Sequence, residues 1–161
     1  MLRESDGTAG ADPRARRDWM QILAQAPVEM LERWRLQAAE TGALPGHAWL
    51  RQPEIGLAMV RGRIGGAGER FNLGEMTVTR CALRIDSGEV GVAYVRGRSQ
   101  RKAELAAFAD ALLQAAAWRE AVRRGLIEPV RAYLQAESRR KQRKAQATRV
   151  EFFTLAREAG K

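Results

Sequence analysis

The residue types most suited to chemistry are concentrated between Arg61 and Arg80, where glycines are interspersed with arginines. Glycine permits positive backbone torsions and close approach, so such a loop can turn its amide groups toward an anion. Arg63, Arg70 or Arg80 would then supply the positive charge. The pattern matches neither the Walker phosphate loop nor the dinucleotide fingerprint, which needs a helix directly after the glycines. A long hairpin loop that needs glycine only for its geometry is an equally good interpretation.

Two carboxylates, Glu69 and Glu75, flank this loop. Paired carboxylates can serve as general acid and base when their environments separate their pKa values. More often such residues form ion pairs with nearby arginines, here Arg70 or Arg80, and hold the shape of the loop. We assign no catalytic residue. The ligand-binding residues that we predict in this segment are Arg63, Gly65, Gly66, Gly68, Glu69, Arg70, Glu75, Thr77, Thr79 and Arg80.

The single cysteine and the single histidine, Cys81 and His47, offer little further chemistry. One cysteine cannot form an internal disulfide or a CxxC-type zinc or iron-sulfur site. Cys81 is expected on the inward face of a strand, where a lone cysteine is usually a small core residue. His47 has no visible acid or base partner, so we expect it at the surface or an interface. We therefore predict no metal centre and no cofactor in this chain, and a free-standing hydrolase is disfavoured.

The positive charge of the chain is concentrated in its second half. The formal net charge is +9, and residues 99–161 carry 14 basic and 7 acidic side chains. Such an excess is compatible with an acidic partner protein, a phosphorylated ligand or a nucleic acid. A basic nucleic-acid-binding module is thus the main alternative function, although the chain has no recognised nucleic-acid motif.

Periodicity predicts the elements that must position these residues. Apolar residues recur at helical spacing from Trp19 to Ala26 and from Leu31 to Ala38, which predicts two N-terminal helices separated at Pro27. Short stretches rich in β-branched and apolar residues then predict a sheet of four mostly antiparallel strands. We expect these strands at 47–52, 55–62, 75–85 and 89–96.

The helical period returns after the last predicted strand. An apolar stripe from Leu105 to Ala116 predicts a long helix that covers the sheet, with Ser99 as its cap. Gly125 interrupts the pattern. The helix that follows, around 128–146, begins apolar and becomes almost wholly polar. A helix without an apolar face projects into water or lies against a partner.

The chain is therefore expected to be an α+β protein with two N-terminal helices, a four-stranded sheet under a long helix, and a basic C-terminal helical arm. We predict a disordered leader at 1–13, the α+β domain at 14–125, and at 126–161 a helix and tail that dock on partner subunits. No apolar run approaches the roughly 18 residues that a membrane-spanning helix needs, and the first residues lack a secretory signal. We therefore expect a cytoplasmic protein.

Two adjacent aromatic residues, Phe152 and Phe153, follow the polar helix, close to Arg149 and Glu151. Aromatic side chains beside arginine are typical anchors of protein interfaces. We predict that these four residues dock onto a partner, and packing against the chain's own domain is the second interpretation.

Several longer motifs together resemble one protein family. In chain order they are Trp19-Met20, the segment from Arg63 to Arg80, Tyr94-Val-Arg-Gly-Arg98, Ala103-Glu-Leu-Ala106, Asp110-Ala-Leu-Leu-Gln114 and Thr148-Arg-Val-Glu-Phe-Phe-Thr154. This order resembles the G subunit of the carbon-phosphorus lyase core complex over nearly the whole chain after the leader. The chain departs from the family pattern at Glu151, where aspartate is usual, and in its looser ending from Leu155 to Lys161.

The resemblance implies membership of a complex whose other core subunits are called H, I and J. With the I, H and L subunits, the family is associated with joining a phosphonate to the ribose C1 of ATP. Adenine is displaced and a ribose 1-phosphonate 5-triphosphate is formed. The I subunit is implicated in the nucleosidase chemistry, and the J subunit carries the cysteines for later radical cleavage. The resemblance thus implies a supporting subunit of a transferase, with ATP and phosphonate as substrates of the complex.

Overall fold

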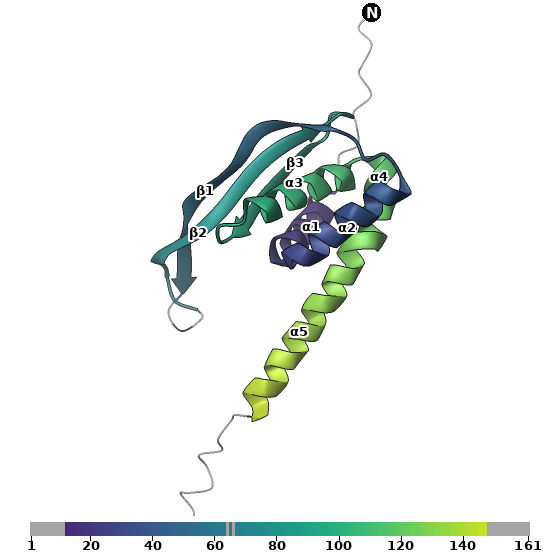
Figure 1. Cartoon of the computed structure of the whole chain (residues 1–161). Coiled ribbons are helices and arrows are strands. Elements are labelled where there is room, and N and C mark those ends of the chain that lie inside the picture. Colours follow the sequence, from purple (N-terminus) through teal and green to yellow (C-terminus); the bar gives the residue numbers. More distant parts are fainter. Residues whose placement is uncertain (1–11, 64, 66, 148–161) are drawn as a thin grey trace, which may run out of the picture.

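The computed structural model describes residues 12–63, 65 and 67–147 (Figure 1). Most of the predicted leader and the whole tail from residue 148 onward lie outside the described residues. The residues predicted to form the tail interface therefore lie outside them as well: Arg149, Glu151, Phe152 and Phe153.

Two helices open the described chain, as the apolar periodicity predicted. They are α1 (Pro13–Gln25) and α2 (Val28–Thr41). Asp12 caps α1, because its carboxylate accepts a hydrogen bond of 3.0 Å from the backbone N–H of Arg14. Pro13 suits the first helical position, since it has no N–H to leave unpaired. The described structure is thus already helical at a residue that we had placed in the leader.

The sheet has three antiparallel strands in the order β1-β2-β3, so the predicted number of four is wrong. The strands are β1 (His47–Arg63), β2 (Arg70–Ile85) and β3 (Val90–Arg96). The stretches 47–52 and 55–62, predicted as two strands, form the single strand β1 with Pro53 inside it. β1 is an edge strand, where proline is tolerated because no ladder hydrogen bond is lost on the free side. The pairing register also shifts between Arg51 and Glu54.

One face of the sheet is covered by α3 (Gln100–Gln114), the long helix that the sequence predicted (Figure 1). Ser99 caps α3 by accepting a hydrogen bond of 3.2 Å from the N–H of Lys102. The strand β3 and the helix α3 approach closely at Gly91, because a Cβ there would lie 1.8 Å from the carbonyl oxygen of Ala107. Only glycine fits at this distance, so the alanine-rich face of α3 packs directly on the backbone of β3.

After a turn at Ala115, the chain is helical to the end of the described residues. The segments are α4 (Ala116–Val122), the π-helical turn η2 (Arg123–Ile127) and α5 (Glu128–Ala147). The predicted break at Gly125 is wrong, because this glycine keeps helical torsions inside the wider π-helical turn. A Cβ at Gly125 would lie 3.6 Å from Cδ1 of Trp34, so η2 packs against α2.

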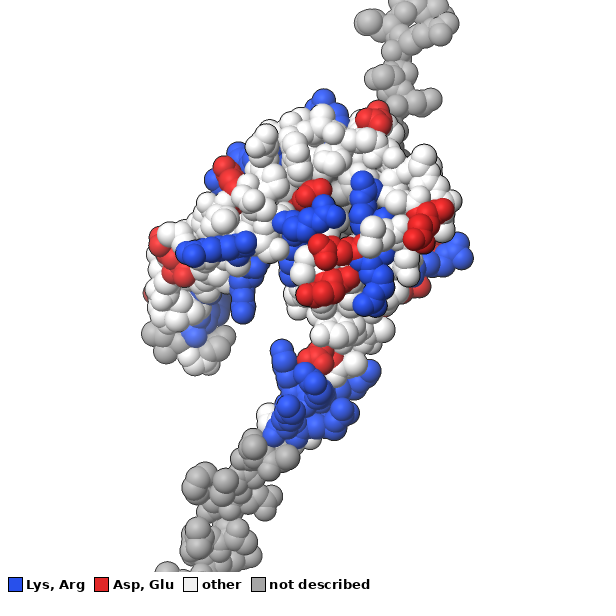
Figure 2. All heavy atoms as spheres, viewed as in Figure 1, with Lys and Arg blue, Asp and Glu red and all other residues white. Residues whose placement is uncertain are grey.

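Two arms project from this body toward the lower part of the view (Figure 1). The first is a two-stranded ribbon, in which residues 57–63 of β1 pair with 70–77 of β2. The last pairing of β3 joins Arg96 to Val78, so the ribbon extends past the three-stranded part of the sheet. The second arm is α5, whose outer half is exposed and densely basic (Figure 2).

Candidate anion-binding and partner-binding site

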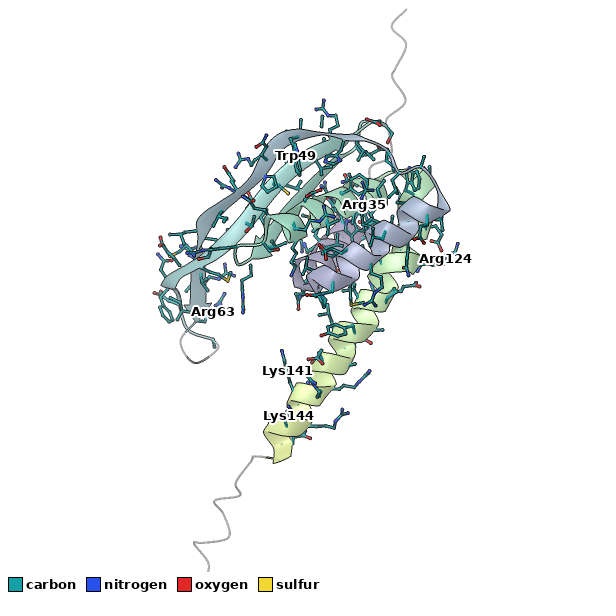
Figure 3. The ribbon with its side chains drawn as sticks, viewed as in Figure 1. Arg35, Trp49, Arg63, Arg124, Lys141 and Lys144 are labelled. Atoms are coloured by element: carbon teal, nitrogen blue, oxygen red, sulfur yellow. The ribbon has the colours of Figure 1, made fainter. Side chains whose placement is uncertain are left out.

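The ribbon ends in two arginines that face each other across the strands. Arg63 is the register partner of Arg70, and both residues are exposed. Figure 3 labels Arg63 at the outer end of the ribbon. Like charges directly opposite each other destabilise a strand pair. Glu69 is also exposed, and in the described structure no ion pair joins it to either arginine. The ribbon tip, defined as Arg63, Glu69 and Arg70, therefore carries positive charge that an anionic group would neutralise.

Glycines shape the turn that joins these two arginines. Gly65 has a φ of +59°, a left-handed torsion that glycine adopts without steric cost. The carbonyl oxygen of Gly68 accepts a hydrogen bond of 3.3 Å from Nη1 of Arg63, which holds that guanidinium beside the turn. Gly66 lies outside the described residues. The connection is short, at 64–69, so most of the glycine-arginine segment is strand.

Thr77 and Thr79 lie at the base of the ribbon and hold the turn that follows β3. The hydroxyl of Thr79 donates a hydrogen bond of 2.7 Å to the carbonyl oxygen of Gly97, and Thr79 is fully buried. The N–H of Gly97 donates in turn to the carbonyl oxygen of Thr77 over 2.9 Å. Gly97 has a φ of +92°, which favours glycine there. The hydroxyl of Thr79 is thus engaged within the fold.

Arg80 and Glu75 lie apart from the ribbon tip. Nε of Arg80 donates a hydrogen bond of 2.7 Å to Glu54, which also accepts from Arg51 over 2.9 Å. The hydrogen bond from Arg80 is the main reason why the pKa of Glu54 lies below its ordinary value. Glu75 is exposed and forms no ion pair in the described structure, so Arg80 pairs with Glu54 instead. Arg80 follows Arg70 by ten positions on one strand, which corresponds to a distance of roughly 30 Å. The two side chains therefore cannot contact one small anion.

Cys81 and His47 both pack against the interior of the domain. Cys81 is the core residue that we predicted, at 1% exposure. Burial, with a smaller contribution from Glu104, raises the pKa of its thiol to about 12, so the thiol stays protonated at neutral pH. The imidazole of His47 contacts Trp49 and Phe108 edge-on, with ring centroids 5.1 Å and 5.6 Å away.

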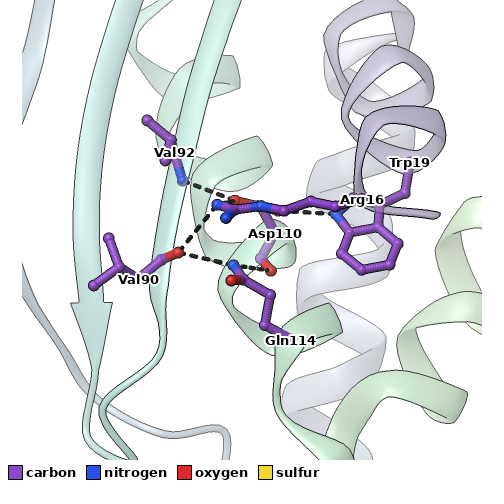
Figure 4. A network of polar contacts seen from close by, with 6 residues as sticks. All are labelled: Arg16, Trp19, Val90, Val92, Asp110 and Gln114. Atoms are coloured by element: carbon purple, nitrogen blue, oxygen red, sulfur yellow. Dashed lines mark hydrogen bonds and ion pairs between the residues drawn. The ribbon is translucent and has the colours of Figure 1, made fainter. Parts of the chain in front are cut away.

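A buried polar network that we did not predict joins α1, α3 and β3 (Figure 4). The carboxylate of Asp110 is fully buried and accepts hydrogen bonds of 2.8 Å from Nη2 of Arg16 and from Nε1 of Trp19. It also accepts a hydrogen bond of 3.0 Å from the backbone N–H of Val92. Nε of Arg16 donates a further hydrogen bond of 3.2 Å, so four donor groups from two other elements offset the cost of burying the charge of Asp110.

The same network satisfies part of the free edge of β3. The carbonyl oxygen of Val90 accepts hydrogen bonds from Nε2 of Gln114 over 2.8 Å and from Nη2 of Arg16 over 3.4 Å. Unpaired edge strands are templates for unwanted pairing, and side-chain cover is one defence. The signal in the sequence was Asp110 itself, the one carboxylate inside the buried apolar run from Leu105 to Leu113.

No group of three or more His, Cys, Asp or Glu side chains is placed to hold a metal ion among the described residues. Within the same part of the chain, no helix combines the length and the apolar character needed to cross a bilayer. Neither the ribbon tip nor the Asp110 network contains a metal-binding group of this kind.

The sequence is similar to known proteins over most of its length. The family model described as phosphonate metabolism protein PhnG matches residues 14–158. The chain belongs to the PhnG family. A curated PhnG relative from Rhizobium meliloti (strain 1021) is 47% identical over 142 residues, which cover 88% of each chain. That relative is named alpha-D-ribose 1-methylphosphonate 5-triphosphate synthase subunit PhnG.

Membership of the PhnG family confirms the resemblance inferred from the motifs. Several residues of these motifs lie together in the structure. Trp19, Asp110 and Gln114 meet in the buried polar network. The segment from Arg63 to Arg80 forms the outer ribbon and its base. These motif residues thus mark one structural junction and one projecting arm of this member of the PhnG family.

Proposed function

We propose that the chain is a supporting subunit of a ribose 1-methylphosphonate 5-triphosphate synthase that acts in organic phosphonate catabolism. With the I, H and L subunits it supports transfer of a phosphonate to the ribose C1 of ATP. A phosphonate oxygen forms the new bond to C1, the bond from C1 to adenine breaks, and adenine leaves. The product is a ribose 1-phosphonate 5-triphosphate. The partners in the core complex are the I, H and J subunits, and the complex works in the cytoplasm.

The observation that carries this proposal is the 47% identity to a curated synthase subunit across 88% of both chains. The chemistry of the described residues agrees with a supporting role. The thiol of Cys81 is buried and protonated, and His47 is packed between aromatic rings. The basic nucleic-acid-binding module, our alternative, was motivated by net charge alone.

Within the complex, we assign the ribbon tip to an anionic group of the substrates. Arg63 and Arg70 face each other without a carboxylate between them, and Arg63 is held to the turn by Gly68. Guanidinium groups bind phosphate and phosphonate oxygens through paired, charge-assisted hydrogen bonds. The remaining part of the site would come from another subunit, because the tip alone offers an open surface.

The test is a double substitution, Arg63→Gln with Arg70→Gln, in the co-purified complex. Adenine release from ATP and methylphosphonate should fall at least about tenfold, because two charge-assisted contacts are removed. Chromatographic measurement of adenine gives the rate, and gel filtration shows whether the complex remains assembled.

Arg84→Gln is the matched control. Arg84 is an exposed arginine on the same strand, far from the ribbon tip, and its loss should leave adenine release unchanged. An assembled complex that carries both tip substitutions and turns over at the unaltered rate would defeat this role for the tip.

A further inference from the structure

The exposed apolar side chains of the domain are concentrated on the ribbon and its base. Nine large apolar side chains are exposed in the described chain, and five of them lie between residues 55 and 73. These five are Ile55, Leu57, Met59, Phe71 and Leu73. A concentration of exposed large apolar side chains in one part of a folded protein marks an interaction site.

One face of the ribbon continues the face of the sheet that α3 covers. Thr79 is buried, and its register partner is Ile55, so both side chains lie on the same face. Leu57 and Met59 follow on this face by strand alternation. The cover by α3 ends before them, because Gln100 at its first turn donates a hydrogen bond of 3.2 Å to the carbonyl oxygen of Pro53. Leu57 is consequently 65% exposed.

The opposite face of the ribbon is apolar as well. A Cβ built on Gly62 would lie 2.4 Å from Cδ1 of Leu73 and 3.7 Å from Cε1 of Phe71, so these two side chains lie over Gly62. Strand alternation places position 62 on the face opposite Leu57 and Met59. Leu73 is 62% exposed even in this position.

A ribbon with two apolar faces is suited to insertion, whereas a ribbon that lies on a surface needs only one such face. An isolated two-stranded ribbon is also marginally stable in water without something to pack against. We propose that the ribbon inserts into a groove of another subunit of the same synthase, with apolar walls and an acidic rim. Residues 57–63 and 70–77 form the inserted stem. This inference rests on the proposed function and names the anchor that brings the ribbon tip into the complex.

Charge identifies the occupant as a different, acidic polypeptide rather than a second copy of this chain. The chain carries a net charge of +9, and Arg61, Arg63 and Arg70 are exposed on the outer ribbon. The outer ribbon has three exposed arginines against the two exposed carboxylates of Glu69 and Glu75, so contact between two copies would bring an excess of positive charge together. The basic outer half of α5 projects toward the same part of the view, so one acidic partner surface could meet both arms (Figure 2).

The test compares substitutions on the two faces of the stem in the full-length chain. The variants are Leu57→Ser with Met59→Ser on one face, and Leu73→Ser on the other. Their affinities for the co-purified remaining synthase subunits are measured by calorimetry. We expect the double variant to bind at least about 100-fold more weakly and the single variant about tenfold more weakly, because buried apolar contacts are lost.

Leu36→Ser is the control, since Leu36 is 68% exposed on α2 and lies outside the ribbon. The affinity of this variant for the other subunits should stay within about twofold of that of the unaltered chain. Thermal unfolding of each isolated variant should match that of the unaltered chain, because all of these side chains are exposed. Hydrogen exchange of the unaltered chain adds a second measurement. The backbone amides of 57–63 and 70–77 should exchange more slowly once the chain is assembled with the other subunits.

Three outcomes would overturn the inference. They are unaltered affinity of both ribbon variants, unchanged hydrogen exchange in the ribbon on assembly, and self-association that the ribbon substitutions abolish. Failure of the proposed anion-binding role of the ribbon tip gives a different result, because adenine release then survives the loss of Arg63 and Arg70 while Leu57→Ser with Met59→Ser still weakens binding.

Discussion

Asp110 of α3 joins this helix to α1 and to β3. Its buried carboxylate accepts hydrogen bonds from Arg16, Trp19 and the backbone of Val92. Arg16 remains partly exposed, with 31% of its side chain open to solvent, so its charge is still hydrated when it pairs. The junction thus combines a fully buried acceptor with a donor at the surface, which limits the desolvation cost to one partner.

Asp110→Ala should lower the free energy of unfolding by about 3 kcal/mol or more, because the donors of Trp19 and Val92 are left buried without an acceptor. Urea-induced unfolding followed by tryptophan fluorescence measures the change. Asp18→Ala is the control, since Asp18 is exposed on α1, and it should change stability by less than about 0.5 kcal/mol. Equal stabilities for the two variants would show that the network contributes little.

The contact between α3 and β3 depends on a glycine rather than on a large apolar side chain. A Cβ on Gly91 would lie 1.8 Å from the carbonyl oxygen of Ala107 and 2.8 Å from the backbone nitrogen of Ala111. Backbone atoms of a buried helix cannot move aside as a flexible side chain can. The distance between the helix and the strand is therefore fixed at this position.

Gly91→Ala should destabilise the domain by roughly 3 kcal/mol or more, because α3 must shift away from the sheet. Gly56→Ala provides the matched control, as Gly56 also lies in a strand but has nothing within 4 Å of a built Cβ. Thermal unfolding of both variants measures the difference. A Gly91→Ala protein as stable as the Gly56→Ala protein would contradict this packing.

Element types were predictable from the sequence, whereas their limits depended on the position of each element in the fold. Pro53 indicated a strand boundary, and only the edge position of β1 explains why the strand continues through it. Gly125 indicated a helix end, yet packing against α2 keeps the helix continuous. The candidate site divides for a similar reason, because one long strand carries Arg70 and Arg80 too far apart for a shared ligand. Asp110 was missed because periodicity records apolar residues and not the donors that a buried carboxylate will meet.

The molecule as a whole consists of a compact body with two arms that its own described residues do not cover (Figure 1). The ribbon is apolar along its stem and basic at its tip, and α5 is basic over its outer half. Val130 and Leu134 anchor the first half of α5 on the body, whereas its outer half and the outer ribbon are exposed. A protein of this shape is best understood as one part of a larger assembly, in agreement with the subunit name of its relative.

The most direct test of this account is sedimentation of the full-length chain co-expressed with the I, H and J subunits, at micromolar concentration. We predict a single species that contains the chain with the other subunits, because both arms require a partner surface. A chain that sediments as a separate, stable monomer beside an assembled complex of the others would contradict the account.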